Sequence, residues 1–545
     1  MNGCVFASRP VHGTVRHNLV VFPPMFRHVD PNTPPPVSFT WLDKAVFSYL
    51  CLPLVIFLAG WFKWWAALPL LACTAYALRP LIAKTPAGAG FAVTPLQIGI
   101  AVVVGSVWSV LGGTDHLFFT NSDWHVRDAV LHDLVASPWP VGYGLLNGYE
   151  SLLRAPVAYF LPAALIGKAA GLPAAHVAML LWTALGATLF LLQVLSLTRS
   201  RLGIAVAVVA VVVLFSGLDI VGSLLNDGPR FRSDWNITTH LEWWAGTYQY
   251  SSITTQLFWV PNHAFAGWLL IGSLYRANRS AQLHSLLPIL FVSAALWSPL
   301  TAVGLAPFVA WILIDAVRRD HSLRLLLPQV WLPALIVGLA VATYLTLDPG
   351  QIPKGVMLGR GGGAAMSFLR QAQFFLLEAG VIGIAIIAIR PSSEVGLALA
   401  ILAVLPAVYI GGGNDLVMRA SIPSLAVLAI ASCLALVEPI AVSAGGAGVA
   451  VRKKAILAGL LVVGAMTPVA ELSRAVLLPT WPINSSATLI GANCGGFPPH
   501  YVARLGDETI GRRLMRTPNQ LPLGPQDRGA CFNPAIELMW GSHPL

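Results

Sequence analysis

The chain has 545 residues, of which 56% are hydrophobic and only 10% are charged, and its formal net charge is +10. A mean hydropathy of +0.72 excludes an ordinary soluble domain and indicates a protein that crosses a membrane many times. A pI near 9.5 would suggest nucleic-acid binding in a soluble protein. Here the positive charges fall between apolar segments, where they set topology and contact anionic lipid, so we expect no nucleic-acid partner.

The first 41 residues contain no membrane segment. They include Arg9, Arg16 and Arg27 and the run Pro34-Pro-Pro36, but no apolar core followed by a small-residue cleavage site. We therefore expect residues 1–41 to be a cytoplasmic arm and not a signal peptide.

Apolar windows approaching the roughly 20 residues that span a bilayer recur between residues 42 and 470. They predict an all-α fold, a polytopic transmembrane helix bundle of about thirteen spans. The predicted spans are 42–60, 63–80, 95–112, 174–197, 203–224, 256–275, 286–300, 301–316, 328–346, 371–389, 395–411, 420–438 and 455–470. Around 286–316, Trp297-Ser-Pro299 interrupts one apolar stretch, which leaves open a tight helical hairpin or a single kinked span.

The loops predicted to face the cytoplasm all contain Lys or Arg if the N-terminus is inside, as the positive-inside rule requires. These residues are Arg79, Lys84, Arg199, Arg201, Arg276, Arg279, Arg318, Arg319, Arg324, Arg390, Arg452, Lys453 and Lys454. The large loops 114–173, 225–255 and 347–370 then lie outside, as do residues 411–419 and the tail 471–545. We expect a multi-pass protein with a cytoplasmic N-terminus and an external C-terminus.

The first large outer loop contains a charged segment between Asn121 and Asp133. Its apolar residues recur every three to four positions and predict a helix; they are Val126, Ala129, Val130 and Leu134. On the other side, His125, Asp128 and His132 can share one stripe. Further along, residues 156–168 are interrupted by proline and too short to cross, which predicts an interfacial or re-entrant helix.

Asp123 stands at the start of this predicted helix. Either Ser122 or Asp123 is suited to cap the first free amides, and a carboxylate held in this way is still rigidly aimed. The His/Asp spacing also allows a divalent cation at Asp123 and His132, although the sequence offers no third fixed ligand.

A second group of polar residues lies in and after the 225–255 loop. His240 and Glu242 occur among aromatic residues, and Asn262 and His263 lie where the next span begins. Together with Trp124 in the first outer loop, they suggest an acceptor-binding or sugar-stacking element. The alternative is that His263 is a satisfied structural hydrogen-bond donor.

A third group is the glycine turn at 411–413 and the Arg419 that follows it. Glycines let backbone amides approach an anion, and Lys354 or Arg360 from the preceding outer loop can join Arg419 in holding a phosphate or pyrophosphate. The alternative is a flexible turn with an interfacial arginine that contacts lipid headgroups.

The cysteines divide by location. Cys51, Cys73 and Cys433 lie in apolar spans, where cysteine behaves as a small core residue. Cys494 and Cys531 share the predicted external tail, which favours a Cys494–Cys531 disulfide over two free thiols. The sequence has no Walker loop, dinucleotide fingerprint, Ser-His-Asp signature or CxxC pair, which argues against an ATP-driven pump or a membrane dehydrogenase.

The pattern resembles the GT-C superfamily of integral-membrane glycosyltransferases. The resemblance is carried by Asp123–Leu134 with Pro138-Trp-Pro140, by the short helix around Tyr159-Phe-Leu-Pro162, and by Gly413–Pro423. Three spans precede the acidic loop instead of one, so two helices would be an N-terminal addition.

The resemblance implies a transferase that moves a sugar from a polyprenyl-phosphate donor to a glycan, lipid or protein acceptor. The site would lie at the periplasmic face of a bacterial inner membrane. In that family, an acidic residue of the first outer loop activates the acceptor or assists metal binding, which makes Asp123 the first candidate and Asp128 the second. Arg419 becomes the best phosphate holder. A transporter or flippase for lipid-linked glycans, or a non-catalytic assembly partner, remains the alternative.

Overall fold

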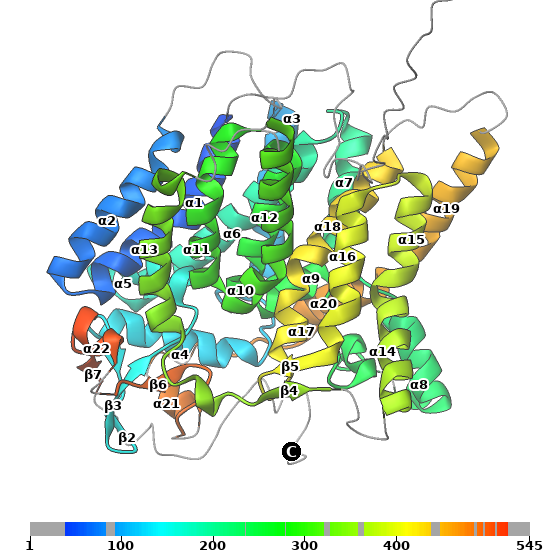
Figure 1. Cartoon of the computed structure of the whole chain (residues 1–545). Helices are drawn as coiled ribbons and strands as arrows, with labels where there is room; N and C mark the ends of the chain where they lie inside the picture. Colours follow the sequence, from blue (N-terminus) through cyan, green and yellow to red (C-terminus); the bar gives the residue numbers. More distant parts are fainter. Residues whose placement is uncertain are drawn as a thin grey trace, which may run out of the picture.

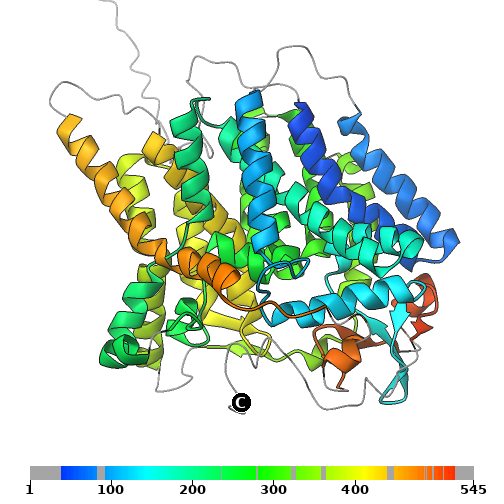
Figure 2. The ribbon, with the colours of Figure 1, turned by 180° about the vertical axis from the view of Figure 1, so that it is seen from behind.

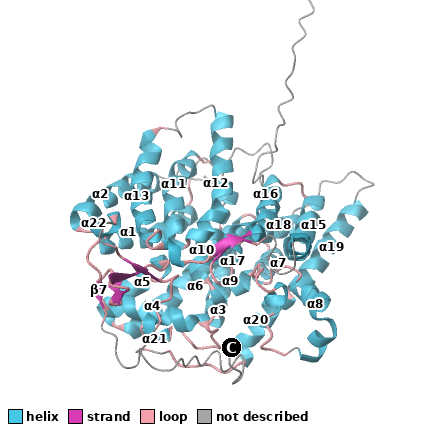
Figure 3. Ribbon diagram, turned by 60° about the horizontal axis from the view of Figure 1, so that its bottom comes forward, coloured by secondary structure: helices cyan, strands magenta, loops and turns pink. Residues whose placement is uncertain are grey.

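The computed structural model describes residues 39–82, 93–234, 236–277, 280–320, 327–357, 364–437, 447–483, 485, 488–493, 496–506 and 509–521. Helices make up 73% of the structure, and the short strands gather at one end of the helical bundle (Figures 1 and 3). The predicted helical bundle is therefore confirmed. We call the end that carries the strands the sheet end.

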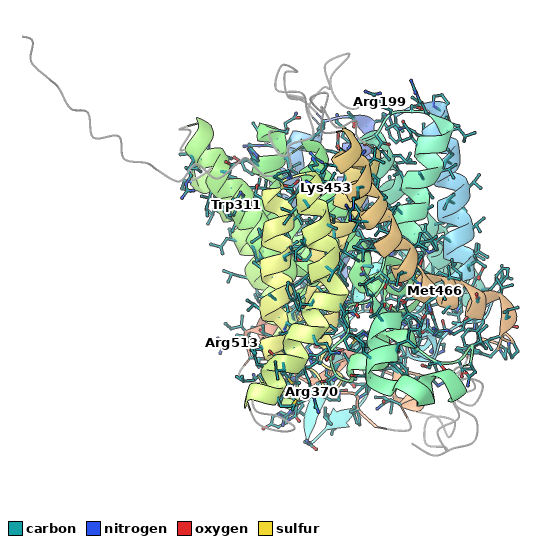
Figure 4. All side chains as sticks on the ribbon, turned by 90° about the vertical axis from the view of Figure 1, so that its right-hand side faces the viewer. Arg199, Trp311, Arg370, Lys453, Met466 and Arg513 are labelled. Atoms are coloured by element: carbon teal, nitrogen blue, oxygen red, sulfur yellow. The ribbon has the colours of Figure 1, made fainter. Side chains whose placement is uncertain are left out.

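The helices that run between the sheet end and the opposite end form the body of the bundle (Figure 1). They are α1 (Trp41–Trp61), α2 (Trp64–Leu78), α3 (Pro95–Leu111), α6 (Leu172–Ser196), α7 (Leu202–Val213), α10 (Pro261–Ala277), α11 (Ala281–Trp297), α12 (Pro299–Asp320), α13 (Pro328–Leu345), α14 (Ala364–Phe375) continued by the π-turn η6 (Leu376–Gly380) and α15 (Val381–Ile389), α16 (Ser393–Val404), α18 (Ile422–Val437) and α19 (Ala447–Gly464). Arg199 and Lys453 lie at the opposite end, and Arg370 and Arg513 lie toward the sheet end (Figure 4).

Seven helical stretches in the described part of the chain are long and apolar enough to cross a membrane. They are Trp41–Trp61, Leu172–Ser196, Pro299–Arg318, Pro328–Leu345, Met366–Ile389, Asp415–Val437 and Gly448–Leu477. Pro95–Leu111, Leu161–Ala170, Leu202–Val213, Ala281–Trp297 and Ser393–Ala407 are shorter apolar helices. The helices therefore have the length and composition of a membrane protein.

The sheet end is built from short elements between these helices. They are α4 (Asp123–Ala136), β1 (Val141–Gly142), β2 (Leu145–Leu146), β3 (Tyr149–Leu153), η2 (Val157–Tyr159), α5 (Leu161–Ala170), α8 (Asp219–Asp234), η3 (Leu241–Ala245), α9 (Ile253–Trp259), η5 (Pro349–Gln351), β4 (Lys354–Val356), η7 (Leu405–Ala407), β5 (Val408–Ile410), α17 (Asp415–Ala420), α20 (Met466–Leu477), α21 (Leu489–Ala492), β6 (Val502–Arg504), α22 (Ile510–Leu514) and β7 (Asn519–Gln520). The 3-10 turn η1 (Arg79–Leu81) lies at the opposite end, after α2. Seen from behind, α20 crosses the bundle instead of following its length (Figure 2).

The three small sheets join parts of the chain that are far apart in sequence. Strand β6 adds to the β2–β3 hairpin in antiparallel register, with Leu152 opposite Ala503. Strand β7 pairs parallel with β1, and β4 pairs antiparallel with β5. The described parts of the tail therefore pack on the loop 114–173 and do not form a separate unit.

Helix starts follow capping rules where the sequence supplies them. Thr40 caps α1 and forms a reciprocal capping box with Asp43, and Pro299 opens α12 at a position that needs no amide donor. The Asp43 carboxylate also accepts a hydrogen bond of 2.9 Å from Nε of Arg276, which ties α1 to α10. Both side chains are buried, so this ion pair fixes the helices at the end opposite the sheets.

For residues 286–316, the sequence allows either a tight helical hairpin or a single kinked span. The structure has the tight hairpin, because α11 and α12 are separate helices joined at Ser298. It also divides the predicted span 203–224, because α7 ends at Val213 and α8 begins at Asp219. Gly217 lies between them against the backbone and carboxylate of Glu378, a contact that leaves no space for a Cβ. The helix breaks because of this distant packing partner.

Helix α4 is confirmed as a helix, but its polar stripe does not face water. His125 is 8% exposed and Asp128 is 3% exposed, while Val130 and Leu134 on the apolar face are fully buried. The helix lies across the sheet end and contacts α5, α6 and α21 (Figures 1 and 2). Its polar residues therefore face other parts of the protein. The contacts that each residue makes there limit the chemistry that it can carry out.

Candidate functional site

A cavity of about 210 Å³ opens at the sheet end, with a largely apolar wall that carries several charged side chains. Its ionisable side chains come from four segments that meet only in the folded chain. The residues are Arg154, His263, Asp415, Arg419, His500 and Tyr501. The turn between α11 and α12 and the end of α13 complete the wall. A space of this size holds several water molecules or one phosphate group with part of what it carries.

Arg419 reaches the cavity from α17, a short helix after the glycine turn. Asp415, one helical turn earlier, forms an ion pair with the Arg419 guanidinium. The Arg419 carbonyl accepts a hydrogen bond of 3.3 Å from Oγ1 of Thr301 on α12. Gly304 allows α12 to approach the backbone of α17 so closely that no Cβ would fit. The backbone around Arg419 is therefore fixed by close packing.

Arg154 enters the cavity from the segment after β3. Its Nη2 donates to the carbonyl of Pro499 at 2.5 Å and its Nη1 donates to the carbonyl of Leu345 at 3.4 Å. Arg154 is 6% exposed, and this burial lowers the pKa of its guanidinium. Arg154 thus connects the loop 114–173, α13 and the tail while it presents positive charge to the cavity.

Three guanidinium groups, two in the cavity lining and one on α4, have buried nitrogens without an acceptor among the described residues. These nitrogens are Nε and Nη1 of Arg127, Nε of Arg154 and Nε of Arg419. A buried donor without a partner costs about 1–3 kcal/mol, and more when the group is charged. An anion with several oxygen atoms supplies acceptors of the required kind. This donor set is therefore suited to a phosphate group.

Asp123 lies at the start of α4 next to these arginines. Its Oδ2 accepts a hydrogen bond of 3.0 Å from Nη2 of Arg127; the Asp123 side chain is 43% exposed and the Arg127 side chain 4%. Arg419 also lies within electrostatic range of Asp123. The accessible carboxylate and the arginine expected to bind phosphate therefore lie within electrostatic range of each other.

The expected helix cap is made by a different residue. The Asp123 amide donates to Oδ1 of Asn121 at 3.1 Å, and Ser122 makes no side-chain capping bond. Asn121 is itself held by a hydrogen bond of 2.8 Å from its Nδ2 to the carbonyl of Phe258. The Asp123 carboxylate is thus left free of the capping role.

Asp128 occupies a different environment from Asp123. It is 3% exposed, and its Oδ2 lies 2.8 Å from Nε2 of His116. Nδ1 of His116 lies 2.9 Å from the carbonyl oxygen of Trp481, which can only accept, so Nδ1 carries a proton. His116 and Asp128 therefore form a closed pair, and His116 also links the loop 114–173 to the tail. Of the two carboxylates, Asp123 is therefore the accessible one.

His132 and Asp123, the residues considered for a metal, are not brought together. Nine positions separate them on α4, which places them on opposite faces of the helix. Nδ1 of His132 contacts Asp133 at 2.9 Å. Asp133 is fully buried, which raises its pKa, and it also accepts hydrogen bonds from Tyr143 Oη and the amide of Leu489. Within the described ranges no group of three or more His, Cys, Asp or Glu residues is arranged to hold a metal ion.

Only one of the proposed acceptor-binding residues lines the cavity, His263. Its Nδ1 lies 2.8 Å from Oγ of Ser298, and its Nε2 lies 3.2 Å from Nδ2 of Asn262. Both ring nitrogens therefore have partners, as the structural alternative expects. Trp124 is buried and donates from Nε1 to the carbonyl of Phe258 at 2.9 Å, so it attaches α4 to α9.

His240 and Glu242 belong to a separate buried network. Nε2 of His240 lies 3.3 Å from Glu471, and its ring stacks on Trp243. The Glu242 carboxylate accepts hydrogen bonds from the Ser252 amide at 2.8 Å and from the Gln249 side chain at 2.7 Å. Burial, with added repulsion from nearby carboxylates, raises the pKa of Glu242 to about 8. These residues do not line the cavity.

The remaining predicted positions divide between the rim and the undescribed segments. Lys354 is exposed on β4, directly opposite Ile410 of β5, whose side chain lines the cavity. Arg360, Cys494 and Cys531 lie outside the described residues, so the proposed disulfide stays a prediction.

No family model, curated protein or solved structure matches the chain.

Sequence reasoning missed Arg127, Arg154, His500 and Tyr501. Arg127 was visible as a basic residue four positions after Asp123, the spacing of a helical ion pair. His500 and Tyr501 carry no such local signal, because the pairing of β6 with β3 brings them to the cavity. Arg154 is placed by the same pairing.

Proposed function

We propose that the protein is an integral-membrane glycosyltransferase of the GT-C type. It moves a sugar from a polyprenyl-phosphate donor to an acceptor at the outer face of a bacterial inner membrane. The observation that carries the proposal is the cavity at the sheet end, which is lined by the incompletely paired Arg154 and Arg419. The accessible carboxylate of Asp123 is paired with Arg127 and lies within electrostatic range of Arg419.

The proposed topology places the sheet end in the periplasm and the N-terminal arm in the cytoplasm. In support, Arg199 and Lys453, which belong to predicted cytoplasmic loops, share the end opposite the sheets (Figure 4). We propose that shorter apolar helices cross together with the seven long ones, giving about thirteen spans, and that α4 and α5 lie at the interface. A lipid-linked donor cannot leave the membrane, so its phosphate must be recognised at this level.

The proposed chemistry uses Asp123 as general base and the arginines as the phosphate site. The Asp123 carboxylate takes the proton of the acceptor hydroxyl while the acceptor oxygen attacks the anomeric carbon. Arg419 and Arg154 stabilise the negative charge that develops on the leaving phosphate. The ion pair with Arg127 orients the Asp123 carboxylate. A divalent cation is a separate possibility that chelation tests directly.

The test is transfer from labelled polyprenyl-phosphate sugars by the full chain in nanodiscs, with and without EDTA. Asp123→Asn should lower the rate by about 10²–10⁴-fold, the usual contribution of a general base. Asp115→Asn is the matched control, because Asp115 lies in the same loop and its Oδ1 accepts only a local amide hydrogen bond, from Leu117. Full activity of Asp123→Asn would exclude the assigned base. A native protein that binds donors but transfers from none would instead support a transporter or an assembly partner.

A further inference from the structure

The glycine turn and Arg419, the pair expected to receive an anion, already hold a carboxylate of the protein itself. Asp415 forms the ion pair with Arg419. Its carboxylate also lies over Gly411, where φ is +91° and an added Cβ would collide with Oδ2 of Asp415. Both features that suit a phosphate therefore surround the Asp415 side chain instead.

An imidazole lies on the other side of this carboxylate. Nδ1 of His500 is 4.0 Å from Oδ2 of Asp415, and the His500 side chain is 37% exposed. The charged groups that face His500 are Asp415 and Arg419 from α17 and Arg154 from the segment after β3. Burial, and then repulsion from Arg419 and Arg154, lower the pKa of His500, so it is neutral at pH 7 while Asp415 stays paired with Arg419.

We propose that Asp415 is an internal stand-in for the substrate phosphate, and that an entering phosphate displaces it from Arg419 toward His500, which then takes up a proton. The inference rests on the proposed function in one respect, the identity of the compound that carries the phosphate. The exchange of one anion for another is a property of the cavity itself.

Simple electrostatics favour this exchange. A phosphate engages a guanidinium through two parallel hydrogen bonds and leaves no room for the Asp415 carboxylate on the same edge of Arg419. Once displaced, Asp415 is within reach of His500. Two negative groups then face the imidazole, and both favour its charged form. Binding of the anion is therefore linked to uptake of one proton.

For glycosyl transfer, the proton on His500 lies beside the leaving group. The bond from the acceptor oxygen to the anomeric carbon forms as the bond from that carbon to the phosphate oxygen breaks, and the electron pair stays on the phosphate. The acceptor proton passes to Asp123, and the proton of His500 passes to the phosphate oxygen. His500 leaves the step neutral, and Asp415 can return to Arg419 as the polyprenyl phosphate departs.

Sulfate is the probe that isolates this linkage, because its charge does not change over the pH range used. Its affinity for the full chain in detergent is measured by calorimetry between pH 5.5 and 8.5. We expect native binding to weaken by up to about tenfold per pH unit as His500 loses its proton. His500→Gln should remove this slope. His263→Gln, which changes the other imidazole of the cavity, should keep it.

Asp415→Asn tests the displacement step separately. Without the competing carboxylate, sulfate should bind roughly fivefold to tenfold more tightly at pH 7.5, since a like charge beside the anion is removed. Glu150→Gln is the matched control for loss of one carboxylate at the sheet end, because Glu150 pairs with Arg512 and does not line the cavity. An affinity of Asp415→Asn equal to that of the native protein would overturn the displacement.

The outcomes separate this inference from the enzymatic function. Absent sulfate binding, or a native pH slope retained in His500→Gln, refutes the proton-linked exchange. The protein could show a pH dependence of sulfate affinity that requires His500 and yet transfer no sugar from any donor. That result would support the exchange and refute the transferase function. If His500→Gln and Asp415→Asn both transfer sugar at the native rate, the proton on His500 has no catalytic role.

Discussion

Glu242 gives a pH-dependent stability whose size can be worked from its environment. It is 1% exposed, and burial raises its pKa from an ordinary 4.5 to about 8, with Asp219 and Glu471 adding repulsion. Because the folded pKa is the higher one, the native state keeps this proton when the unfolded chain has lost it. The contribution is present below pH 4.5 and is lost as the pH rises through 8. The difference of about 3.5 between the two pKa values corresponds to about 5 kcal/mol.

Glu242→Gln removes this titration and keeps most of the shape of the side chain. We expect the variant to match the native protein near pH 5 and to become more stable than it by up to about 5 kcal/mol at pH 9. Thermal unfolding in detergent at both pH values measures this. For 545 residues, about 2.1 cal/mol/K of unfolding entropy per residue makes 1 kcal/mol roughly 1 °C, so the gain in Tm is roughly 4–5 °C.

Two outcomes would refute this reasoning about Glu242. A Tm difference that is the same at pH 5 and pH 9 would mean that the carboxyl is already charged in the folded protein. If Glu242→Gln abolished sugar transfer without changing stability, the prediction that Glu242 belongs to the acceptor site would be supported instead. Glu150→Gln, with a side chain 29% exposed, is the control and should show no comparable pH effect.

Two further substitutions test the packing that positions the site. Gly304→Ala should cost about 1–3 kcal/mol and weaken sulfate binding at least about tenfold, because its Cβ would collide with the Ala420 carbonyl oxygen. The control Gly396→Ala meets no atom within 4 Å, and equal effects of the two changes would contradict this account. Tyr143→Phe removes a 2.8 Å hydrogen bond to buried Asp133 and should cost about 1–3 kcal/mol in thermal unfolding. An unchanged Tm would show that this bond contributes nothing.

The sequence predicts the ends of helices well where residues next to the break mark it. Pro299 ends the apolar run of α11 and opens α12, so the hairpin at Ser298 was one of two readings available without a structure. The break after Val213 is marked in the sequence only by the short polar stretch from Ser216 to Asp219, which a hydropathy window averages with its apolar neighbours. It is imposed by Gly217 packing on Glu378, which lies more than a hundred residues away in the sequence.

The candidate site was predictable in part for the same reason. Asp123 and Arg419 stand out as charges beside apolar segments, and the structure brings them within electrostatic range of each other. His240 and Glu242 stand out equally, but aromatic packing encloses them: the His240 ring centroid lies 4.5 Å from that of Trp243. Whether an aromatic neighbour stacks on a ligand or on the protein is decided by tertiary burial, which spacing along the chain does not encode.

The hydrogen bond from Arg154 to Pro499 joins residues 345 positions apart, which has a consequence for biogenesis. At roughly 5–20 residues per second, a ribosome needs roughly 20–70 s to make the chain between them. During that interval the Arg154 guanidinium lacks the Pro499 carbonyl, while most helices of the bundle have already been synthesised. The cavity can therefore close only late in synthesis, so a nascent chain stalled before Pro499 should contain nearly all the helices and still lack the site.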